Sequence, residues 1–416
     1  MSSNQDVIVV GGGVIGVCVA YYLRKSGRSV TLLERDHICS GSSYGNGGLI
    51  LPSHSMPLSV PGAILKGLTF MLDPSSPFYI KPRLSIDLFL WMLRFMSASN
   101  YQSMRSTMSV ITNMASFSRT LYEEIISEES LDFGFERRGQ INLASTPKGY
   151  EEILLEAELL AEEGLSYDIL EGEDVVIKEP SIIPGMPGGI FFHDDSHLVP
   201  NQFVEKLASR FVELGGIIET NVEILGFDID NHRVIAARSP QDLYKANDFV
   251  LAAGSWTSNF SRNLNVSVPI QPAKGYSITI DMPENGPQIP IMLADAKVGV
   301  TPMGSKLRFA GTLELSGFDS NISMKRVQGI SDGVREHLNV DFSLDDAEIW
   351  YGMRPLSPDG LPIVGRLDQV KNLILASGHS TLGMTLGPAT GQLVSELIGC
   401  DQTTIDPKPF SPMRFK

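Results

Sequence analysis

The pattern of apolar and polar positions at the start of the chain predicts a buried strand, a glycine turn and a helix. Residues 7–10 are a short apolar run, three glycines follow, and a second apolar run covers 14–23. Short apolar runs of this kind are typical of parallel strands that are covered on both faces. Gly27 is expected to close the helix, and 29–33 to form a second strand that ends at Glu34.

The same patterns predict a discontinuous first domain. Expected helices cover 101–129, 148–163, 201–214, 325–338 and a stretch ending at Ile398, and expected strands cover 133–144, 217–227, 233–238, 248–253, 266–281, 306–315 and 372–377. The apolar strands 248–253 and 372–377 each run into a glycine, which suits a return to the first parallel sheet after a long excursion. The predicted fold class is α/β plus α+β. A discontinuous Rossmann-like domain comprises 1–55, 148–262 and 350–416, and a domain with a mixed β-sheet and helices comprises 56–147 and 263–349.

Composition and charge exclude several classes of protein. The chain has 416 residues, of which 43% are hydrophobic and 19% charged, as in an ordinary globular protein. A formal charge of −15 disfavours nucleic acid and an anionic membrane as electrostatic partners, and leaves room only for a local basic patch. Cys18, Cys39 and Cys400 give neither a disulfide framework nor metal-ligand spacing, so we predict no metal and a reducing compartment. No secretory signal opens the sequence, which favours a cytoplasmic protein.

One stretch, 84–96 (LSIDLFLWMLRFM), has the apolar character of a membrane-associated segment. It is shorter than the ~20 residues of a spanning helix and contains Asp87 and Arg94. Two interpretations stay open: an amphipathic helix packed on the core, which the pattern favours, and an interfacial helix that rests peripherally on the inner face of the cell membrane.

The glycine turn carries the first chemical signal. Gly11, Gly13 and Gly16 fit G-x-G-x-x-G, in which absent side chains permit a tight turn, close approach of a pyrophosphate and close packing of helix on strand. Glu34 lies at about the ~20-residue offset of the acid that binds an adenosine ribose. The loop 40–48 is small and polar and is expected to run along the cofactor. These residues predict an adenine dinucleotide and leave FAD and NAD open.

Six motifs in this order resemble a known family. They are the turn 11–16, SSYGNGG at 42–48, LAAGSWT at 251–257, KGYS at 274–277, GMRPLSPDGLPIVG at 352–365 and GHSTLGMTLGPATG at 378–391. Together they resemble the D-amino-acid oxidase superfamily of FAD-dependent oxidoreductases over nearly the whole chain. Within it the chain looks most like the small subunit of bacterial D-amino-acid dehydrogenases, with glycine and sarcosine oxidases as relatives. The block at 384–391 is closer to the glycine oxidase pattern.

The resemblance implies a GR2-type FAD-binding domain. The cofactor-binding residues that follow from the motifs and their neighbours are Gly11, Gly13, Val14, Ile15, Gly16, Glu34, Arg35, Ser42, Ser43, Asn46, Gly47, Gly48, Leu49, Val222, Ala253, Gly254, Trp256, Gly378, His379, Thr381, Leu382, Gly383, Met384 and Thr385. The turn at 382–391 would direct a helix N-terminus at the flavin and favour the negative charge of its reduced form. Because 378–391 contains no cysteine, FAD should be bound non-covalently.

Four residues are candidates for the substrate site. Arg354 precedes a proline, which favours an extended strand end, and relatives use this arginine as a bidentate anchor for the substrate carboxylate. Tyr276 is a candidate to bond that carboxylate or to cap the pocket, with a tyrosine in the sheet core as the equal alternative. His379 and His54 are candidates to touch flavin or substrate, and structural histidines are the alternatives. Lys274 is expected to face solvent.

The implied reaction is oxidative deamination of a small amino acid, most closely a D-amino acid. Hydride transfer from Cα to flavin N5 gives an imino acid, which hydrolyses to a 2-oxo acid and ammonia, and the electrons pass to a quinone, another carrier or dioxygen. The alternatives are an oxidase of glycine, sarcosine or a hydroxyproline, and an FAD-bearing subunit without turnover. A pyridine-nucleotide dehydrogenase is a further alternative.

Overall fold

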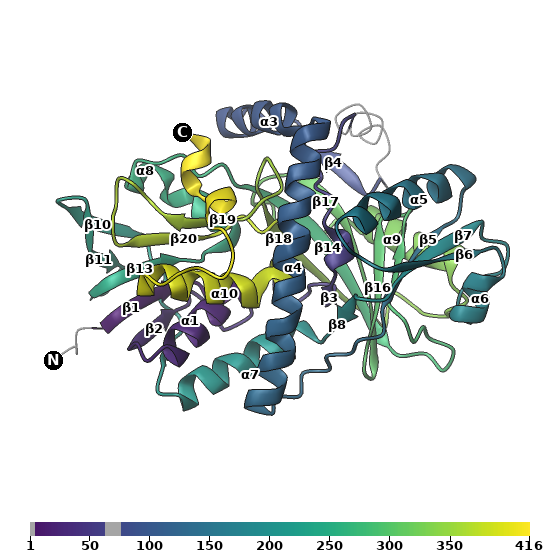
Figure 1. The fold of residues 1–416 in the computed structure, drawn as a ribbon, viewed down its shortest axis with the longest axis horizontal. Helices are drawn as coiled ribbons and strands as arrows, with labels where there is room; N and C mark the ends of the chain where they lie inside the picture. The colour runs from purple at the N-terminus through teal and green to yellow at the C-terminus, as the bar shows by residue number, and fades with distance from the viewer. Residues whose placement is uncertain (1–4, 63–75) are drawn as a thin grey trace.

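The computed structural model describes residues 5–62 and 76–416, so part of the predicted segments 1–55 and 56–147 lies outside the described residues. Two large sheets lie toward opposite ends of the long axis, and the helix α4 (Tyr101–Glu129) runs between them (Figure 1). In the described part of the chain one sheet has six strands and the other has nine.

The six-stranded sheet is the expected parallel sheet. Its order is β19 (Ile363–Arg366), β20 (Leu373–Ser377), β13 (Ala246–Leu251), β1 (Gln5–Val10), β2 (Val30–Leu33) and β9 (Ile217–Glu219). All neighbours pair in parallel except β19 with β20. The returns predicted at 248–253 and 372–377 are confirmed, since β13 lies beside β1 and β20 lies beside β13.

Four helices build one core against this sheet. They are α1 (Val14–Lys25), α7 (Pro200–Glu213), α10 (Gly383–Gly399) and α4. Cys18 and Phe203 are completely buried in this core, and Tyr122 of α4 donates to the Met384 carbonyl over 2.7 Å. The sequence assigned 101–129 to the second domain, but the apolar face of α4 packs on the nucleotide-binding side.

The nine-stranded sheet is mixed. Its order is β18 (Glu348–Leu356), β14 (Gln271–Asp281), β17 (Lys306–Leu315), β16 (Val298–Met303), β15 (Ile291–Leu293), β5 (Gln140–Ala144), β7 (Gly188–Phe192) and β6 (Tyr167–Glu171), with β4 (Phe78–Ile80) beside β17. The helix α9 (Met324–His337) packs on one face of it.

Two of the predicted domain boundaries differ from the division made by the sheets. The sequence assigned 148–262 to the FAD-binding domain, but α5 (Pro147–Glu162), β6, α6 (Asp174–Lys178) and β7 build onto the second sheet, because β7 pairs with β5. The sequence also assigned 350–416 to the first domain, but β18 pairs with β14 of the second sheet along its length.

Smaller elements complete the chain. The expected strand 217–227 is divided between β9 and β10 (Gly226–Asp230), and β10 pairs with β11 (Arg233–Arg238) and β11 with β12 (Leu243–Tyr244). Close to the first domain lie β3 (Leu49–Ile50), which pairs with β8 (Ser196–His197), and the short helices η1 (Pro52–His54), η2 (Gly254–Phe260), α8 (Ser261–Leu264), η3 (Lys408–Phe410) and η4 (Pro412–Phe415).

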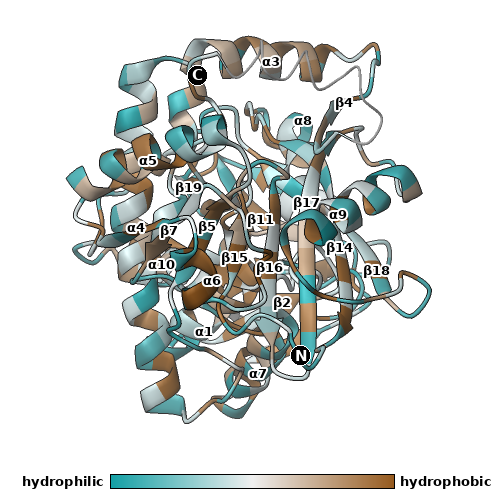
Figure 2. Cartoon of the chain, turned by 90° about the vertical axis from the view of Figure 1, so that its right-hand side faces the viewer, coloured by the Kyte–Doolittle hydropathy of each residue, from teal (hydrophilic) through white to brown (hydrophobic). Residues whose placement is uncertain are grey.

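The apolar stretch 84–96 forms most of α3 (Ile86–Ala98), at the edge of the molecule (Figure 2). Its inner side is packed, since Trp91 is 3% exposed and donates to the Leu356 carbonyl over 3.1 Å. Its outer side is not covered by the described chain, with Ile86 78% and Phe89 61% exposed. Among the residues described, no helix is long and apolar enough to cross a membrane.

Candidate active site

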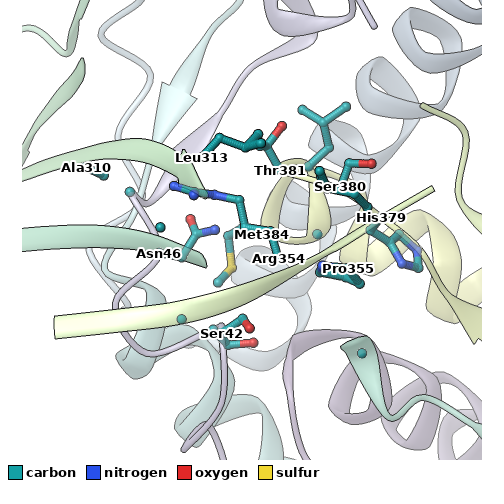
Figure 3. Close-up of a pocket in the computed structure, with 18 of the residues that line it drawn as sticks. Ser42, Asn46, Ala310, Leu313, Arg354, Pro355, His379, Ser380, Thr381 and Met384 are labelled. Atoms are coloured by element: carbon teal, nitrogen blue, oxygen red, sulfur yellow. The ribbon is translucent and has the colours of Figure 1, made fainter. Parts of the chain in front are cut away.

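A cavity of about 1090 Å³ lies between the two sheets and is lined by residues from both. Part of its wall is drawn in Figure 3, where Arg354, Asn46 and Met384 face one another across it. Its volume is at the upper end of ligand sites in proteins, which suits a dinucleotide together with a small substrate.

One end of the cavity is the glycine turn between β1 and α1. Gly11 has φ +112°, and a Cβ on it would lie 2.5 Å from the Ala252 carbonyl oxygen. A Cβ on Gly16 would lie 1.8 Å from the Gly11 carbonyl oxygen. Both positions therefore require glycine, and the N-terminus of α1 opens on a cradle that a pyrophosphate can approach closely.

Glu34 stands at the end of β2 beside this turn, as the sequence predicts. Its carboxylate accepts from the Gly12 N–H over 2.5 Å and from the Asp36 N–H over 2.8 Å. The neighbouring guanidinium of Arg35 lies 4.8 Å from the ring centroid of Trp256. These side chains form a polar and aromatic wall at the end of the cavity where an adenosine would bind.

Val222 joins the same end, because its N–H donates to the Glu34 carbonyl over 2.9 Å. Ala253 and Gly254 follow β13 and also line the cavity. Ser377 donates through Oγ to the Gly254 carbonyl over 2.9 Å, which ties the ends of β13 and β20 together.

The loop 42–48 is held between α1 and the second sheet. Ser43 Oγ accepts from the Val14 N–H over 3.0 Å, and Ser42 donates to the Met353 carbonyl over 2.6 Å. The Asn46 side chain accepts from the Gly48 N–H over 2.9 Å. The small residues of this loop therefore run along the cavity, in the position that the sequence predicts.

Arg308, for which the motifs predict no role, holds this loop in place. It is 5% exposed on β17, and Nη1 donates to the carbonyls of Tyr44 and Asn46, both over 2.9 Å. A lone arginine between apolar neighbours in a predicted strand was the only available signal.

The N-terminus of α10 opens toward the cavity from the first domain. Within the described residues no side chain caps it, and Thr381, Leu382, Gly383 and Met384 line the cavity there. Thr385 donates to the Leu49 carbonyl over 3.2 Å. The uncapped N–H groups give this wall a positive partial charge, which suits the electron-accepting end of a flavin.

Arg354 lies inside the cavity on β18. Its side chain crosses the second sheet over Gly275, and Nη1 donates to the Thr312 carbonyl over 2.5 Å. Thr312 has φ +66°, an uncommon conformation for a β-branched residue, at an irregularity in the pairing of β17 with β14.

The guanidinium of Arg354 keeps its charge without an acidic partner. Burial lowers the pKa of Arg354 to about 10, which leaves it cationic at neutral pH, and no carboxylate of the described chain contributes to that shift. Nη1 and Nη2 each donate to one backbone carbonyl, that of Thr312 and, over 3.4 Å, that of Gly311, so the remaining N–H groups of the guanidinium can bind an external carboxylate.

Tyr276 and Lys274 lie on the opposite face of the sheet from Arg354. Arg354 pairs with Ala273 and Gly352 with Gly275, so alternation turns the intervening side chains of β14 away. Tyr276 is 1% exposed and donates to Glu314 over 3.0 Å, within the core formed with α9. The structure therefore favours the core alternative for this residue.

Lys274 does not face solvent, so the prediction for this residue is wrong. It is 1% exposed, donates to the Asn321 carbonyl over 2.7 Å and lies 3.5 Å from Glu314. The buried carboxylate of Glu314 is also 3.4 Å from Arg326, so the two cations balance a charge that the sequence pattern does not reveal.

His379 lines the cavity, and its ring is buried against α10. It is 2% exposed, and its Nε2 lies 2.9 Å from Thr390 Oγ1. Because that hydroxyl donates to the Leu386 carbonyl, it accepts from His379 Nε2–H, which leaves Nδ1 as an acceptor with no partner in the described chain. Burial lowers the pKa of His379 to about 3, so the ring is neutral.

His54, at the end of η1, lines the cavity. Burial and the nearby Lys297 lower its pKa. The preceding Ser53 donates through Oγ to Asp195 over 2.5 Å, and its N–H donates to the same carboxylate over 3.2 Å, which fixes the turn that carries His54.

These observations fit FAD. The glycine cradle, the acid at the end of β2 and the uncapped helix of the first domain match the pyrophosphate, ribose and flavin of that cofactor. In the described part of the chain no cluster of residues could hold a metal ion.

Comparison with known proteins defines the class. A family model described as FAD dependent oxidoreductase matches residues 6–397, and the chain belongs to this family. It is 29% identical over 416 residues to D-amino acid dehydrogenase of Granulibacter bethesdensis, covering 98% of this chain and 99% of that one. It is 30% identical to D-amino acid dehydrogenase of Methylobacterium radiotolerans, covering 95% and 96%.

The fold is also that of a solved structure. Glycine oxidase from Geobacillus kaustophilus superimposes with a TM-score of 0.78 at 22% identity, covering 99% of each chain. The predicted family, fold class and FAD cofactor are thereby confirmed.

Proposed function

We propose that the protein oxidises D-amino acids to imino acids, which hydrolyse to 2-oxo acids and ammonia, and passes the electrons to a quinone or another carrier. The observation that carries the proposal is Arg354, an unpaired cation that faces the loop 42–48 and the N-terminus of α10 across one cavity. The names of the relatives support the D-configuration.

Arg354 is proposed to bind the substrate carboxylate and thereby orient Cα toward the flavin. When bound, FAD supplies the acceptor for the Cα hydride. Burial lowers the pKa of both histidines of the region, His54 and His379, which makes them weak bases. We therefore propose that the substrate enters with a neutral amine and that no side chain serves as a strong base.

An anaerobic test measures bleaching of the visible flavin absorbance by single amino acids. We expect D-amino acids to bleach it, and no bleaching by any of them would contradict the proposal. Admission of air then reports the acceptor, since rapid recovery with peroxide release indicates an oxidase. A glycine or sarcosine oxidase, which the block 384–391 favours, would respond to glycine or sarcosine instead.

We also propose that the protein is cytoplasmic and that the outer face of α3 rests on the inner face of the cell membrane. All three cysteines are free, which supports a reducing compartment. The segment 76–100 carries three basic residues, Lys81, Arg83 and Arg94, against one acidic residue, in a chain of net charge −15. This local basic character beside exposed apolar side chains complements an anionic bilayer.

Cosedimentation with phosphatidylglycerol-containing and pure phosphatidylcholine vesicles tests this contact. We expect binding to the anionic vesicles that Phe89→Asp abolishes. Equal recovery of the variant and the native protein with vesicles would overturn the membrane proposal without affecting the enzymatic one.

A further inference from the structure

The cavity has one wall that neither the cofactor nor the carboxylate anchor requires. This wall, here called the α3 wall, consists of Ile80, Trp91, Met92, Phe95, Leu313 and Leu356. We propose that it selects amino acids with a large apolar side chain, such as leucine, methionine and phenylalanine. The inference rests on the proposed function and specifies its substrate class.

The α3 wall adjoins the carboxylate anchor. Leu356 lies two residues after Arg354 on β18, so the side chains of both project from the same face of the strand. Leu313 follows Thr312, whose carbonyl accepts from the Arg354 guanidinium. An amino acid whose carboxylate is held by Arg354 therefore has an apolar protein surface within reach of its side chain.

This surface is rigid and partly uncovered. Trp91 is fixed by its bond to the Leu356 carbonyl, and Phe95 stacks on it with ring centroids 5.2 Å apart and an interplanar angle of 18°. Met92, Phe95 and Leu313 remain partly exposed around this buried cluster. A large apolar side chain of the substrate would cover the surface that these three residues still expose.

Charged side chains do not suit the α3 wall. None of its six residues carries a charged side chain, so an ammonium or carboxylate placed there would lose hydration without gaining a partner. Charged groups do line the cavity elsewhere, with Glu156 and Lys297 near His54, and the charge of Lys297 acts on both neighbours. If the enzyme preferred substrates with a charged side chain, the region near His54 would receive that side chain and the proposal for the α3 wall would be wrong.

The size of the expected effect follows from apolar burial. Burial of the side chain of a leucine or phenylalanine substrate against the α3 wall should raise kcat/KM about 10- to 100-fold over that for alanine. Glycine and alanine should be poor substrates, and D-aspartate and D-lysine should be at least as poor.

The experiment measures flavin reduction by stopped flow in the anaerobic holoenzyme with D-alanine, D-leucine, D-methionine, D-phenylalanine, D-aspartate and D-lysine. Phe95→Ala should lower the preference for leucine over alanine several-fold, because it removes apolar surface that only the larger side chain covers. Phe89→Ala on the outer face of the same helix is the matched control and should preserve the whole profile. A spectral titration of the oxidised flavin with acetate and phenylacetate adds a measurement without turnover, in which phenylacetate should bind more tightly.

The outcomes separate the two proposals. Bleaching by D-alanine and D-aspartate as fast as by D-leucine overturns the substrate class and leaves the proposed function intact. No bleaching by any substrate overturns the function itself. If Phe95→Ala slows reoxidation by a soluble quinone but leaves the substrate profile unchanged, the wall receives the electron acceptor and the inference is wrong.

Discussion

Gly275 is predicted to be important for carboxylate binding because it makes room for the side chain of Arg354. The side chain of Arg354 lies directly over it, so that a Cβ at this position would be 1.7 Å from Nη1 and 2.2 Å from Cζ. Real Cβ atoms essentially never approach other heavy atoms within 3.0 Å, so Gly275→Ala must displace the guanidinium by about 1 Å or more. The backbone of Gly275 has no positive φ, and the obstructing atoms are the end of a flexible side chain. The substitution should therefore leave folding almost unchanged.

The cost should appear in catalysis. A charged hydrogen-bonded contact is worth about 1.5–3 kcal/mol, and a misplacement of ~1 Å costs about 10²-fold in rate. We expect kcat/KM of Gly275→Ala to fall by about 10- to 100-fold, mainly through KM, with FAD content and melting temperature close to native values.

The control is the same substitution in an Arg354→Ala background. There the added methyl group has nothing to displace, so the double variant should match Arg354→Ala alone. A native KM in Gly275→Ala, or an equal further loss in the Arg354→Ala background, would contradict the predicted displacement of Arg354.

Three further predictions concern the anchor, the cofactor cradle and a buried acid. Arg354→Met should lower kcat/KM by about 10²- to 10³-fold with FAD retained, as measured by steady-state kinetics and flavin absorbance, and native kinetics would contradict its role. Gly16→Ala should lose FAD, since its Cβ would collide with the Gly11 carbonyl, and a flavin-loaded variant would refute the cradle. Burial raises the pKa of Asp195 to about 7, so the folded protein keeps a proton that the unfolded chain releases above about pH 4. The free energy of unfolding should therefore fall as pH rises from about 4 to 7. Denaturant titrations across pH should show a smaller fall in Asp195→Asn, and an identical slope would oppose this assignment.

The first domain could be predicted from sequence because its signals are local. Each of these signals is contained in a few consecutive residues: the apolar strand before Gly11, the glycine turn, and the strand that ends at the acid Glu34. The strands 248–253 and 372–377 carry the same apolar signature, which allowed the sheet to be assembled across long gaps. Antiparallel pairing in the second sheet has no such signature, so the membership of β6, β7 and β18 was missed.

The candidate site was predicted in part for the same reason. Motif residues such as Asn46 and Arg354 line the cavity. Tyr276 also contributes to the lining, but its side chain packs in the core on the other face of the sheet, because one position of register decides which face a strand side chain occupies. The backbone conformation of Thr312 and the anchoring role of Arg308 depend on contacts between distant segments. No local pattern predicts them.

The most direct test of the account is anaerobic mixing of the FAD-loaded protein with a D-amino acid in parallel for the native chain and Arg354→Met. We predict rapid bleaching of the native flavin by D-leucine and no comparable bleaching of the variant, although both bind FAD. Equal bleaching of the two proteins, or a native flavin that no amino acid reduces, would contradict the central claim that Arg354 holds an amino acid for oxidation.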